Sequence, residues 1–259
     1  MTARDSTLAD NAERASEVAL AALFTALDSR RNFKLEAGAG AGKTYSLIQA
    51  LRRILKNKSV YLPRSDQRVA CLTYTKVARD EIKARTDEDP AIFADTLHGF
   101  LWEMISPYQK ALATAIRSSE TWQERLAENS DISGLAIEYD LGIRGLHEDR
   151  ITLHHTDIPE FAIQLFGNEK FRSLITDRFP VIFIDEYQDT PSGLAEAVLS
   201  GHGEDRTSPV VGFFGDHWQQ IYDRTCGSFE PSSPTSVPKN AKFPSGPSVL
   251  DFLNKLRPE

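Results

Sequence analysis

Cysteine is almost absent from this 259-residue sequence, which contains only Cys71 and Cys226. Two distant cysteines without CxxC spacing argue against a disulfide scaffold or a zinc site, and they fit a reducing compartment. Long apolar runs are missing too, because the longest, residues 18–27, falls well short of the roughly 20 residues that span a bilayer. The first ten residues lack the apolar core of a signal peptide. We therefore expect a cytoplasmic protein with no membrane partner.

Positive charge is in deficit overall, with 30 Lys and Arg against 37 Asp and Glu and a net charge of −7. Taken alone, this balance speaks against a nucleic-acid partner. The distribution is uneven, however. Residues 43–85 hold eleven basic and three acidic residues, whereas residues 103–178 hold thirteen acidic and eight basic residues. Any phosphate-binding surface is therefore expected in the early basic segment.

Apolar patterning predicts alternating strands and helices in the first part of the chain. In order we expect a helix over 6–30, a strand over 33–37, a helix over 46–56, a strand over 69–74, a helix over 76–85, a strand over 92–94 and a helix over 96–105. This order predicts an α/β fold with a parallel sheet and right-handed crossovers. Residues 181–184 and 210–214 are expected to be further buried strands, and Thr190-Pro191 to open a helix.

The chain divides into three expected parts. Residues 1–105 and 178–230 form one discontinuous α/β domain, and residues 106–177, which are acidic and irregular, form an inserted helical subdomain. Residues 231–259 begin with five of the thirteen prolines between Pro231 and Pro247, which predicts a linker or irregular crossing segment. A last helix is expected over 248–256.

A glycine-rich loop stands between the strand at 33–37 and the helix that follows it. It reads Ala37-Gly38-Ala39-Gly40-Ala41-Gly42-Lys43-Thr44. Glycines let successive backbone N–H groups turn inward around phosphate oxygens, and the helix N-terminus adds partial positive charge. Lys43 can reach the β- and γ-phosphates, and the Thr44 hydroxyl can ligate Mg²⁺. The pattern predicts an ATP- and magnesium-binding loop, with an ordinary Gly-rich turn as the alternative.

The apolar run at 181–184 ends in two carboxylates, Asp185 and Glu186. Open α/β sheets bind their ligands at the carboxyl ends of strands. Asp185 is expected to hold Mg²⁺, directly or through water, and Glu186 to polarise the attacking water as general base. Alone, the pair could equally be two solvated carboxylates at a strand end. Together with the loop, it specifies one reaction, nucleotide hydrolysis.

Five short motifs stand in a fixed order along the chain. They are the loop at 37–44, which fits AxxGxGKT, Leu72-Thr73-Tyr74-Thr75-Lys76, Thr96-Leu97-His98-Gly99-Phe100, the string DEYQDT at 185–190, and Phe214-Gly215-Asp216-His217-Trp218-Gln219-Gln220-Ile221-Tyr222. In this order they resemble the phosphate loop and motifs Ia, Ib, II and III of UvrD/Rep/PcrA-like superfamily 1 DNA helicases. The resemblance implies a P-loop RecA-like ATPase domain with a helical insert between motifs Ib and II.

The resemblance also implies roles for single residues. Gln219 would sense the γ-phosphate, and Phe243, in a Lys242–Ser245 string similar to motif IV, would stack on adenine. The residues expected to contact single-stranded DNA are Thr73, Tyr74, Thr96, His98 and Tyr222. Tyr74 offers an aromatic face to bases, and Thr96 and His98 offer donors to phosphate. Core packing is the alternative for Tyr74, and Trp218 and Tyr222 stay open between core packing and base stacking.

The sequence departs from the helicase pattern in several places. No glutamine precedes Gln49 to read adenine, the segment after Tyr222 lacks the usual aromatic-Arg-Gly, and Pro244 stands where an arginine is expected. We expect the second RecA-like domain, with its arginine finger, to be missing from this chain. An arginine finger is worth about 10³- to 10⁵-fold in rate, so we expect this chain to bind nucleotide, hydrolyse it poorly and not translocate alone.

Three functions compete at this point. The leading one is the motor half of an ATP-dependent DNA helicase or translocase. The second is a nucleotide-dependent helicase-like subunit that regulates a protein partner such as a nuclease. The third is a P-loop ATPase acting on protein or RNA.

Overall fold

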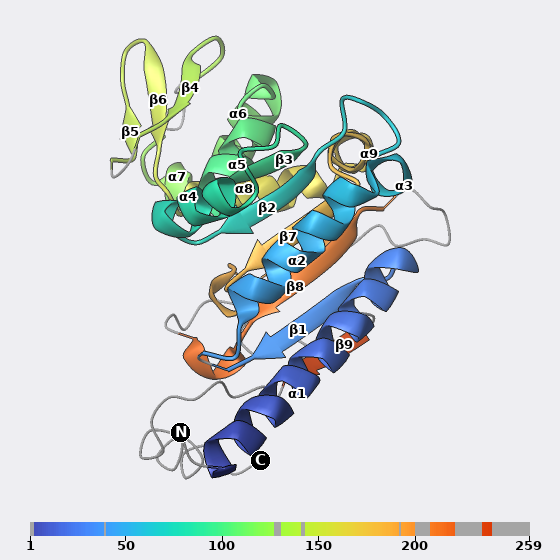
Figure 1. Cartoon of the computed structure of the whole chain (residues 1–259). Coiled ribbons are helices and arrows are strands. Elements are labelled where there is room, and N and C mark those ends of the chain that lie inside the picture. The colour runs from blue at the N-terminus through green and yellow to red at the C-terminus, as the bar shows by residue number, and fades with distance from the viewer. Residues whose placement is uncertain are drawn as a thin grey trace.

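The computed structural model describes residues 3–38, 40–126, 131–140, 143–191, 193–199, 208–220 and 235–239. Its centre is a six-stranded sheet in the order β3-β2-β7-β8-β1-β9 (Figure 1). The strands are β1 (Phe33–Ala37), β2 (Val69–Thr73), β3 (Ile92–Thr96), β7 (Val181–Asp185), β8 (Val210–Gly215) and β9 (Thr235–Lys239). Every neighbouring pair is parallel, so all six carboxyl ends meet at one edge. The expected P-loop RecA-like α/β fold is confirmed.

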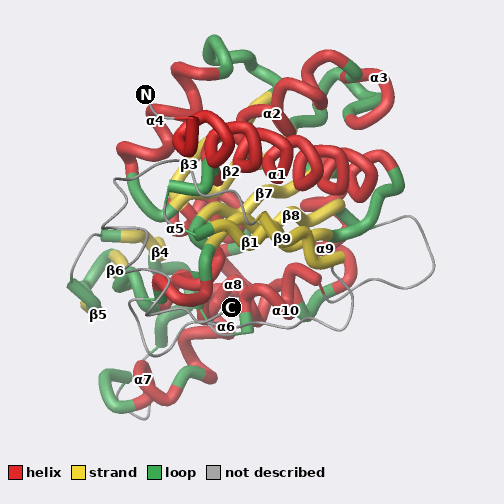
Figure 2. The backbone as a smooth tube through the Cα atoms, turned by 60° about the horizontal axis from the view of Figure 1, so that its bottom comes forward, coloured by secondary structure: helices red, strands yellow, loops and turns green. Residues whose placement is uncertain are grey.

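Helices cover both faces of this sheet, as Figure 2 shows for α1, α2 and α4 on one side and α6, α8 and α10 on the other. The first group is α1 (Ala3–Asp28), α2 (Lys43–Lys56) and α4 (Lys76–Arg85). Helix α2 buries Leu47, Leu51 and Ile54, which recur at the spacing of one helix face. The Thr75 hydroxyl caps α4 by accepting a hydrogen bond from the Ala78 N–H at 3.2 Å. Helix α2 therefore presents one apolar face to the sheet, whereas α4 buries only Ile82.

Three aromatic rings lock the central strands together on that face. Phe33 of β1, Phe183 of β7 and Phe214 of β8 lie in mutual edge-to-face contact, with centroids 5.4 to 6.0 Å apart. Gly212 of β8 leaves room for them, because a Cβ there would lie 2.4 Å from the Phe33 ring. This cluster holds the two strands that end in the phosphate loop and in Asp185 at a fixed separation.

The segment 106–177 is less helical than its sequence predicts. Its helices are α6 (Gln109–Ser118), α7 (Glu120–Gln123), α8 (Asp157–Phe166) and the start of α9 (Glu169–Arg178). A small sheet β4-β6-β5 lies among them, formed by β4 (Ala136–Tyr139), β5 (Gly145–Leu146) and β6 (Arg150–Leu153). These strands are two to four residues long, too short for a period-2 pattern to stand out. The segment therefore combines helices with a small sheet, and its assignment as an inserted helical subdomain stays a prediction.

The apolar side chains of this segment join the core beneath the main sheet. Trp122, Phe161 and Phe166 belong to the same buried cluster as Ile182 of β7 and Phe213 of β8. Helix α5 (Leu97–Ile105) contributes Phe100 and Met104 to that cluster. The division of the chain into a main domain and an inserted subdomain stays a prediction, because one continuous core lies under both.

The helix expected at Thr190-Pro191 begins later. A 3₁₀ turn, η1 (Tyr187–Asp189), follows β7, and α10 runs over Leu194–Leu199. Thr190 is extended, with φ −67° and ψ 134°, because the ring of a following proline disfavours the helical conformation. Tyr187, Gln188 and Asp189 are buried under the sheet edge instead.

The proline-rich segment contributes a strand that its composition did not predict. Strand β9 pairs with β1 in parallel and brings Pro238 opposite Glu36. A proline is tolerated there because β9 is an edge strand, where no further neighbour needs its N–H. The remaining predictions for 240–259, including Phe243, Pro244 and the helix over 248–256, lie outside the described residues.

Within the described residues, no helix combines the length and the apolar character that crossing a membrane requires.

Candidate nucleotide site

The glycine-rich loop connects the end of β1 directly to the first residue of α2. Gly40 and Gly42 have φ of 73° and 79°, in the left-handed region that residues with a Cβ rarely adopt. The Ala41 N–H donates to the Gly38 carbonyl at 3.0 Å, which closes the turn. Helix α2 starts at Lys43, three residues earlier than the sequence predicts. The loop thus delivers Lys43 and Thr44 on the first turn of a helix, and Ala39 lies outside the described residues.

The loop and the acidic end of β7 meet at one edge of the sheet. The Lys43 Nζ lies 2.6 Å from the Glu186 Oε2, and the Lys43 side chain is only 12% exposed. These residues are 143 positions apart in sequence, and strand β8 separates β1 from β7. A half-buried ammonium paired with a carboxylate marks the position where phosphate oxygens would compete for the same cation.

Asp185 lies at the end of β7 in an environment that disfavours its charge. Burial, and secondarily the neighbouring Glu186 carboxylate, raise its pKa to about 6, although Lys43 acts in the opposite direction. A nearby divalent cation would stabilise the charged form of a carboxylate in this position. Its Oδ1 accepts a hydrogen bond from the Glu186 N–H at 3.1 Å, which fixes its orientation.

The residues present fit a magnesium ion that is shared with a nucleotide. Among the described residues no group of three or more His, Cys, Asp or Glu is arranged to hold a metal by itself. Magnesium usually keeps several waters and binds through one or two carboxylates together with substrate phosphates. Asp185 and the Thr44 hydroxyl supply such a partial set, so any metal here would depend on the nucleotide.

Glu186 adopts a backbone conformation that is unusual for a residue with a side chain. Its φ of 51° and ψ of 48° are left-handed, a conformation that costs about 1–3 kcal/mol and is concentrated at functional sites. The Asp189 N–H holds the turn by donating to the Glu186 carbonyl at 3.0 Å. This turn redirects the chain out of β7 and leaves the Glu186 carboxylate facing Lys43.

A hydrogen-bonded chain connects Glu186 to Gln219. The Gln188 Nε2 donates to the Glu186 Oε2 at 2.7 Å, and the Gln188 Oε1 accepts from the Asp216 N–H at 3.1 Å. The Gln219 Nε2, in the 3₁₀ turn η2 (His217–Gln219), donates to the Asp216 Oδ2 at 3.0 Å. Sequence reasoning gave Gln188 and Asp216 no role. Their presence inside the DEYQDT and GDHWQQIY strings was the available signal.

Glu36, near the end of β1, forms a second cluster that the sequence did not reveal. It accepts from the Tyr187 hydroxyl at 2.6 Å and lies 3.1 Å from the His217 Nδ1 and 3.2 Å from the Lys34 Nζ. Burial opposes its charge, but Tyr187, Lys34 and His217 outweigh it and lower the pKa of Glu36. The cluster ties β1 to both 3₁₀ turns and stiffens the floor of the site.

The described residues expected to contact nucleic acid lie at the same edge, on β2, β3 and the segments that follow them. Thr73 and Thr96 are neighbours in the pairing of β2 with β3. Thr73 is 1% exposed and donates to the Thr75 carbonyl, whereas the Thr96 hydroxyl caps α5 by accepting from the Gly99 N–H. Both hydroxyls therefore have structural partners, and the Thr73 side chain is not on the surface. Tyr74 is 39% exposed.

His98 is partly buried at the start of α5. Burial, and secondarily the charge of His155, lower its pKa, and the two rings lie edge to face with centroids 6.2 Å apart. His155 directly follows His154, whose ring lies 3.9 Å from it. A neutral imidazole is the favoured form of His98. Tyr222, the last residue expected to contact nucleic acid, lies outside the described residues.

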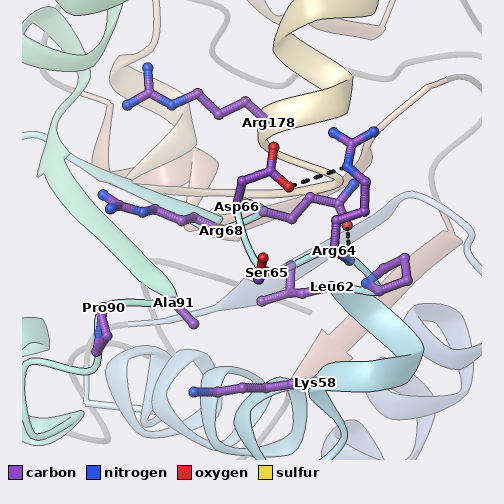
Figure 3. A pocket seen from close by; sticks show the side chains of 11 residues that line it. Lys58, Leu62, Arg64, Ser65, Asp66, Arg68, Pro90, Ala91 and Arg178 are labelled. Atoms are coloured by element: carbon purple, nitrogen blue, oxygen red, sulfur yellow. Dashed lines mark hydrogen bonds and ion pairs between the residues drawn. The ribbon is translucent and has the colours of Figure 1, made fainter.

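The early basic segment does not form one continuous surface. Lys58, Arg64 and Arg68 precede β2 and line a hollow of about 620 Å³ at the amino-terminal edge of the sheet, together with Arg178 (Figure 3). The reason is the length of α2, which carries the chain from the phosphate loop to the opposite edge (Figure 1). The basic residues Lys76, Arg79, Lys83 and Arg85 lie on α4, which directly follows Tyr74 and Thr75.

The hollow at the amino-terminal edge is close to neutral. Lys58 pairs with Asp89 at 2.9 Å, Arg64 with Asp66 and Asp177 at 3.3 Å each, and Arg178 with Glu103 at 2.8 Å. Cations with carboxylate partners have little excess charge to offer a phosphate. The carboxyl-terminal edge, with Lys43, Asp185 and Gln219, is therefore the candidate site.

A loop with left-handed glycines before a helix, facing an acidic strand end across one intervening strand, defines a nucleotide-binding protein of the P-loop class. The pattern that characterises the AAA domain family matches residues 20–225, and the chain belongs to this family. The matched range contains the loop, Asp185, Glu186 and Gln219. An AAA-type domain implies nucleotide binding, which agrees with the nucleotide-binding loop predicted from the sequence.

Two curated relatives are similar to the chain. One is the Gabija protein GajB of Bacillus cereus strain HuB5-5, which is 23% identical over 330 residues, covering 91% of this chain and 48% of that protein. The other is the Gabija protein GajB of Bacillus cereus strain VD045, which is 28% identical over 200 residues, covering 74% of this chain and 38% of that protein. The chain thus spans less than half the length of these relatives.

Proposed function

We propose that this chain is the ATP-binding motor half of a UvrD/Rep/PcrA-like superfamily 1 DNA helicase or translocase. The observation that carries the proposal is the contact between Lys43 and Glu186, because it unites the phosphate loop with the expected general base. The match to an AAA domain supports the nucleotide, and the five ordered motifs support the helicase class. We further propose that the protein is cytoplasmic and that its function is similar to that of the Gabija protein GajB.

The geometry supports a simple sequence of events at the phosphate end. Incoming β- and γ-phosphate oxygens displace the Glu186 carboxylate from the Lys43 ammonium, since both anions compete for it. Thr44 and Asp185 would hold the magnesium ion, which neutralises charge on the phosphate oxygens. Glu186, released from Lys43, can then accept a proton from the water that attacks the γ-phosphorus. Gln219 would sense the γ-phosphate.

Single-stranded DNA is the proposed second ligand. Tyr74 offers a partly exposed ring at the end of β2, and bases stack on such rings with about 1–3 kcal/mol each. Lys76 and Lys83, on the following helix, add positive charge for the phosphate backbone. Thr96 and His98 complete the surface in this proposal, and buried Thr73 supports the loop that presents Tyr74.

The first test is nucleotide binding by Lys43→Ala. We expect Mg-ATP affinity, measured by isothermal titration calorimetry, to fall by about 100-fold, because charge-assisted bonds to two phosphates contribute about 1.5–3 kcal/mol each. Lys56→Ala, at the other end of α2, removes the same charge and should bind like the wild type. Equal affinity of Lys43→Ala and the wild type would refute the phosphate-loop assignment.

A second candidate function is a helicase-like subunit whose nucleotide state controls a protein partner such as a nuclease. The departures after Tyr222 and at Pro244 favour it, because they affect motif positions associated with DNA and γ-phosphate rather than the loop. It predicts a partner that co-purifies with the wild type in the presence of ATP and is lost from Lys43→Ala. Retention of the same partner by Lys43→Ala would exclude this function.

A further inference from the structure

Gln188 is a fully buried polar residue between the two halves of the site. Its side chain is 1% exposed, and both ends of its amide are engaged, one by Glu186 and the other by the Asp216 N–H. Gly215 leaves room for it, because a Cβ at that position would lie 2.3 Å from the Gln188 Oε1. The end of β8 therefore leaves room for this side chain and for the neighbouring Tyr187 ring, whose Cδ1 would lie 2.5 Å from the same Cβ.

We propose that Gln188 is a positioning residue that keeps the Glu186 carboxylate oriented while Lys43 exchanges Glu186 for the nucleotide phosphates. The inference rests on the proposed function and assigns a role that the motif resemblance does not supply. It concerns a side chain that does not touch the reacting atoms and acts only through Glu186.

Glu186 accepts hydrogen bonds from two different side chains. Lys43 and Gln188 both donate to the same oxygen, the Glu186 Oε2, at 2.6 and 2.7 Å. When phosphate takes the ammonium, Glu186 loses its cation and keeps the Gln188 amide. A neutral amide has no comparable attraction to phosphate, so Gln188 stays where it is. The base thus retains one fixed hydrogen bond through the exchange.

The backbone holds the Gln188 side chain in place. Its Oε1 is bound to a backbone N–H rather than to a mobile side chain, and the same residue, Asp216, accepts the hydrogen bond from Gln219 through its carboxylate. Glu186, through Gln188, and Gln219 are therefore both anchored by hydrogen bonds to Asp216, which directly follows β8. A displacement of Gln219 by the γ-phosphate would reach the base through three hydrogen bonds.

The test compares two substitutions that remove different bonds. Gln188→Met fills the space and removes both hydrogen bonds. Gln188→Glu keeps the acceptor for the Asp216 N–H and replaces the amide donor to Glu186 with a carboxylate oxygen. Gln67→Met is the matched control, because Gln67 is also buried, accepts from a backbone N–H (Arg64) and donates to an oxygen (of Asp177), at the opposite edge of the sheet. Circular dichroism verifies folding.

Two quantities are measured on the whole chain, Mg-ATP affinity and single-turnover hydrolysis with protein in excess. Both Gln188 variants should slow hydrolysis about tenfold or more, a fraction of what a general base contributes. They should also weaken Mg-ATP binding about threefold, because Glu186 then holds Lys43 more tightly. Gln67→Met should change neither, and both effects should vanish when Glu186→Gln is already present.

The outcomes separate this inference from the proposed function. Wild-type behaviour of Gln188→Met, or an undiminished effect of Gln188→Met on top of Glu186→Gln, would overturn the positioning role. If the wild type binds Mg-ATP without turnover, hydrolysis by this chain is refuted, and the affinity comparison alone decides the role of Gln188. If the wild type does not bind Mg-ATP, the proposed function fails, and the positioning role fails with it.

Discussion

At the scale of residues, Asp185 and Glu186 each have a feature that lowers the stability of the folded chain. Burial raises the pKa of Asp185 to about 6 from an ordinary value of 3.8, and Glu186 adopts a left-handed backbone. Both features cost free energy that the surrounding strands must offset. Neither is needed to form the sheet, which fits a carboxylate that holds a cation and a carboxylate that accepts a proton.

The first prediction concerns Asp185 and stability. Because its folded pKa lies above the unfolded value, the folded chain binds more protons between about pH 4 and 6. Stability is therefore lost as the pH rises through 6. Asp185→Asn removes this penalty, so the free energy of unfolding at pH 7 should rise by about 1–3 kcal/mol. Urea denaturation measures it, with Asp149→Asn as an exposed control. A destabilised Asp185→Asn would contradict the assigned pKa.

The same carboxyl predicts a pH dependence of magnesium binding. Below pH 6 a proton competes with the cation for Asp185, so the magnesium-dependent part of ATP affinity should fall as the pH drops from 7 to 5. Titrations with and without EDTA isolate that part. In Asp185→Asn the magnesium dependence should be small at every pH tested. An equal pH dependence in both proteins would remove Asp185 from the metal site.

Glu186 gives a prediction with opposite effects on binding and turnover. Glu186→Gln removes the anion that holds Lys43, so Mg-ATP affinity should stay equal or increase, by up to about tenfold. Hydrolysis should fall by about 10²- to 10⁴-fold, the range of general-base catalysis. Calorimetry and single-turnover assays measure the two quantities. Undiminished hydrolysis would exclude Glu186 as the base.

At the scale of elements, helix α2 decides which basic residues serve the site. It begins at the phosphate loop and ends at the opposite edge, so Lys58, Arg64 and Arg68 lie far from Tyr74 although all belong to one basic segment. Helix α4, which directly follows Tyr74, brings its own basic residues to the carboxyl-terminal edge. Its Thr75 cap fixes the start of the helix beside the exposed ring.

This difference predicts the salt dependence of DNA binding. Neutralising Lys76, Arg79 and Lys83 to Gln should weaken single-stranded DNA binding and lower the salt slope by up to about 0.7 for each phosphate that these side chains neutralise in the wild type. Neutralising Lys58, Arg64 and Arg68 removes the same total charge at the other edge and should leave the slope unchanged. Fluorescence anisotropy over a salt series measures both. Equal slopes for the two triple variants would refute the proposed DNA surface.

At the scale of the whole molecule, the packing makes residues 106–177 part of one structure with the sheet. Trp122 lies in the same buried cluster as Ile182 and Phe213, and no separate core of comparable size is present in the described part of that segment. Cooperative unfolding follows from shared buried surface. The segment and the sheet should therefore lose their structure together.

Tryptophan fluorescence tests this expectation. With Trp102 and Trp218 replaced by Phe, the fluorescence of Trp122 reports on the segment, and far-UV circular dichroism reports on the whole chain. The two urea transitions should coincide, with midpoints within experimental error. An earlier Trp122 transition would show that residues 106–177 fold as an independent domain. A far-UV spectrum like that of the wild type is the control for the double replacement.

The strands of the main sheet other than β9, and the phosphate loop, were predictable because a short local pattern of residues determines each of them. Strand β2 is five buried residues in a row, and the left-handed positions of the phosphate loop carry glycines at Gly40 and Gly42. The small sheet in 136–153, the edge strand β9 and the extended Thr190 were not predictable. Their conformations depend on partners far away in the chain or on a proline that acts on its predecessor.

The sequence by itself determined the chemistry available here: a lysine and a threonine after a glycine loop, two carboxylates after an apolar strand, and a glutamine further on. Only the tertiary structure decided that Lys43 pairs with Glu186, that Gln188 links Glu186 to Asp216, and that Lys58, Arg64 and Arg68 lie at the opposite edge of the sheet. The physical reason is that these outcomes are set by strand order and by the length of one helix. Those are properties of the assembled sheet, and no local pattern of residues encodes them.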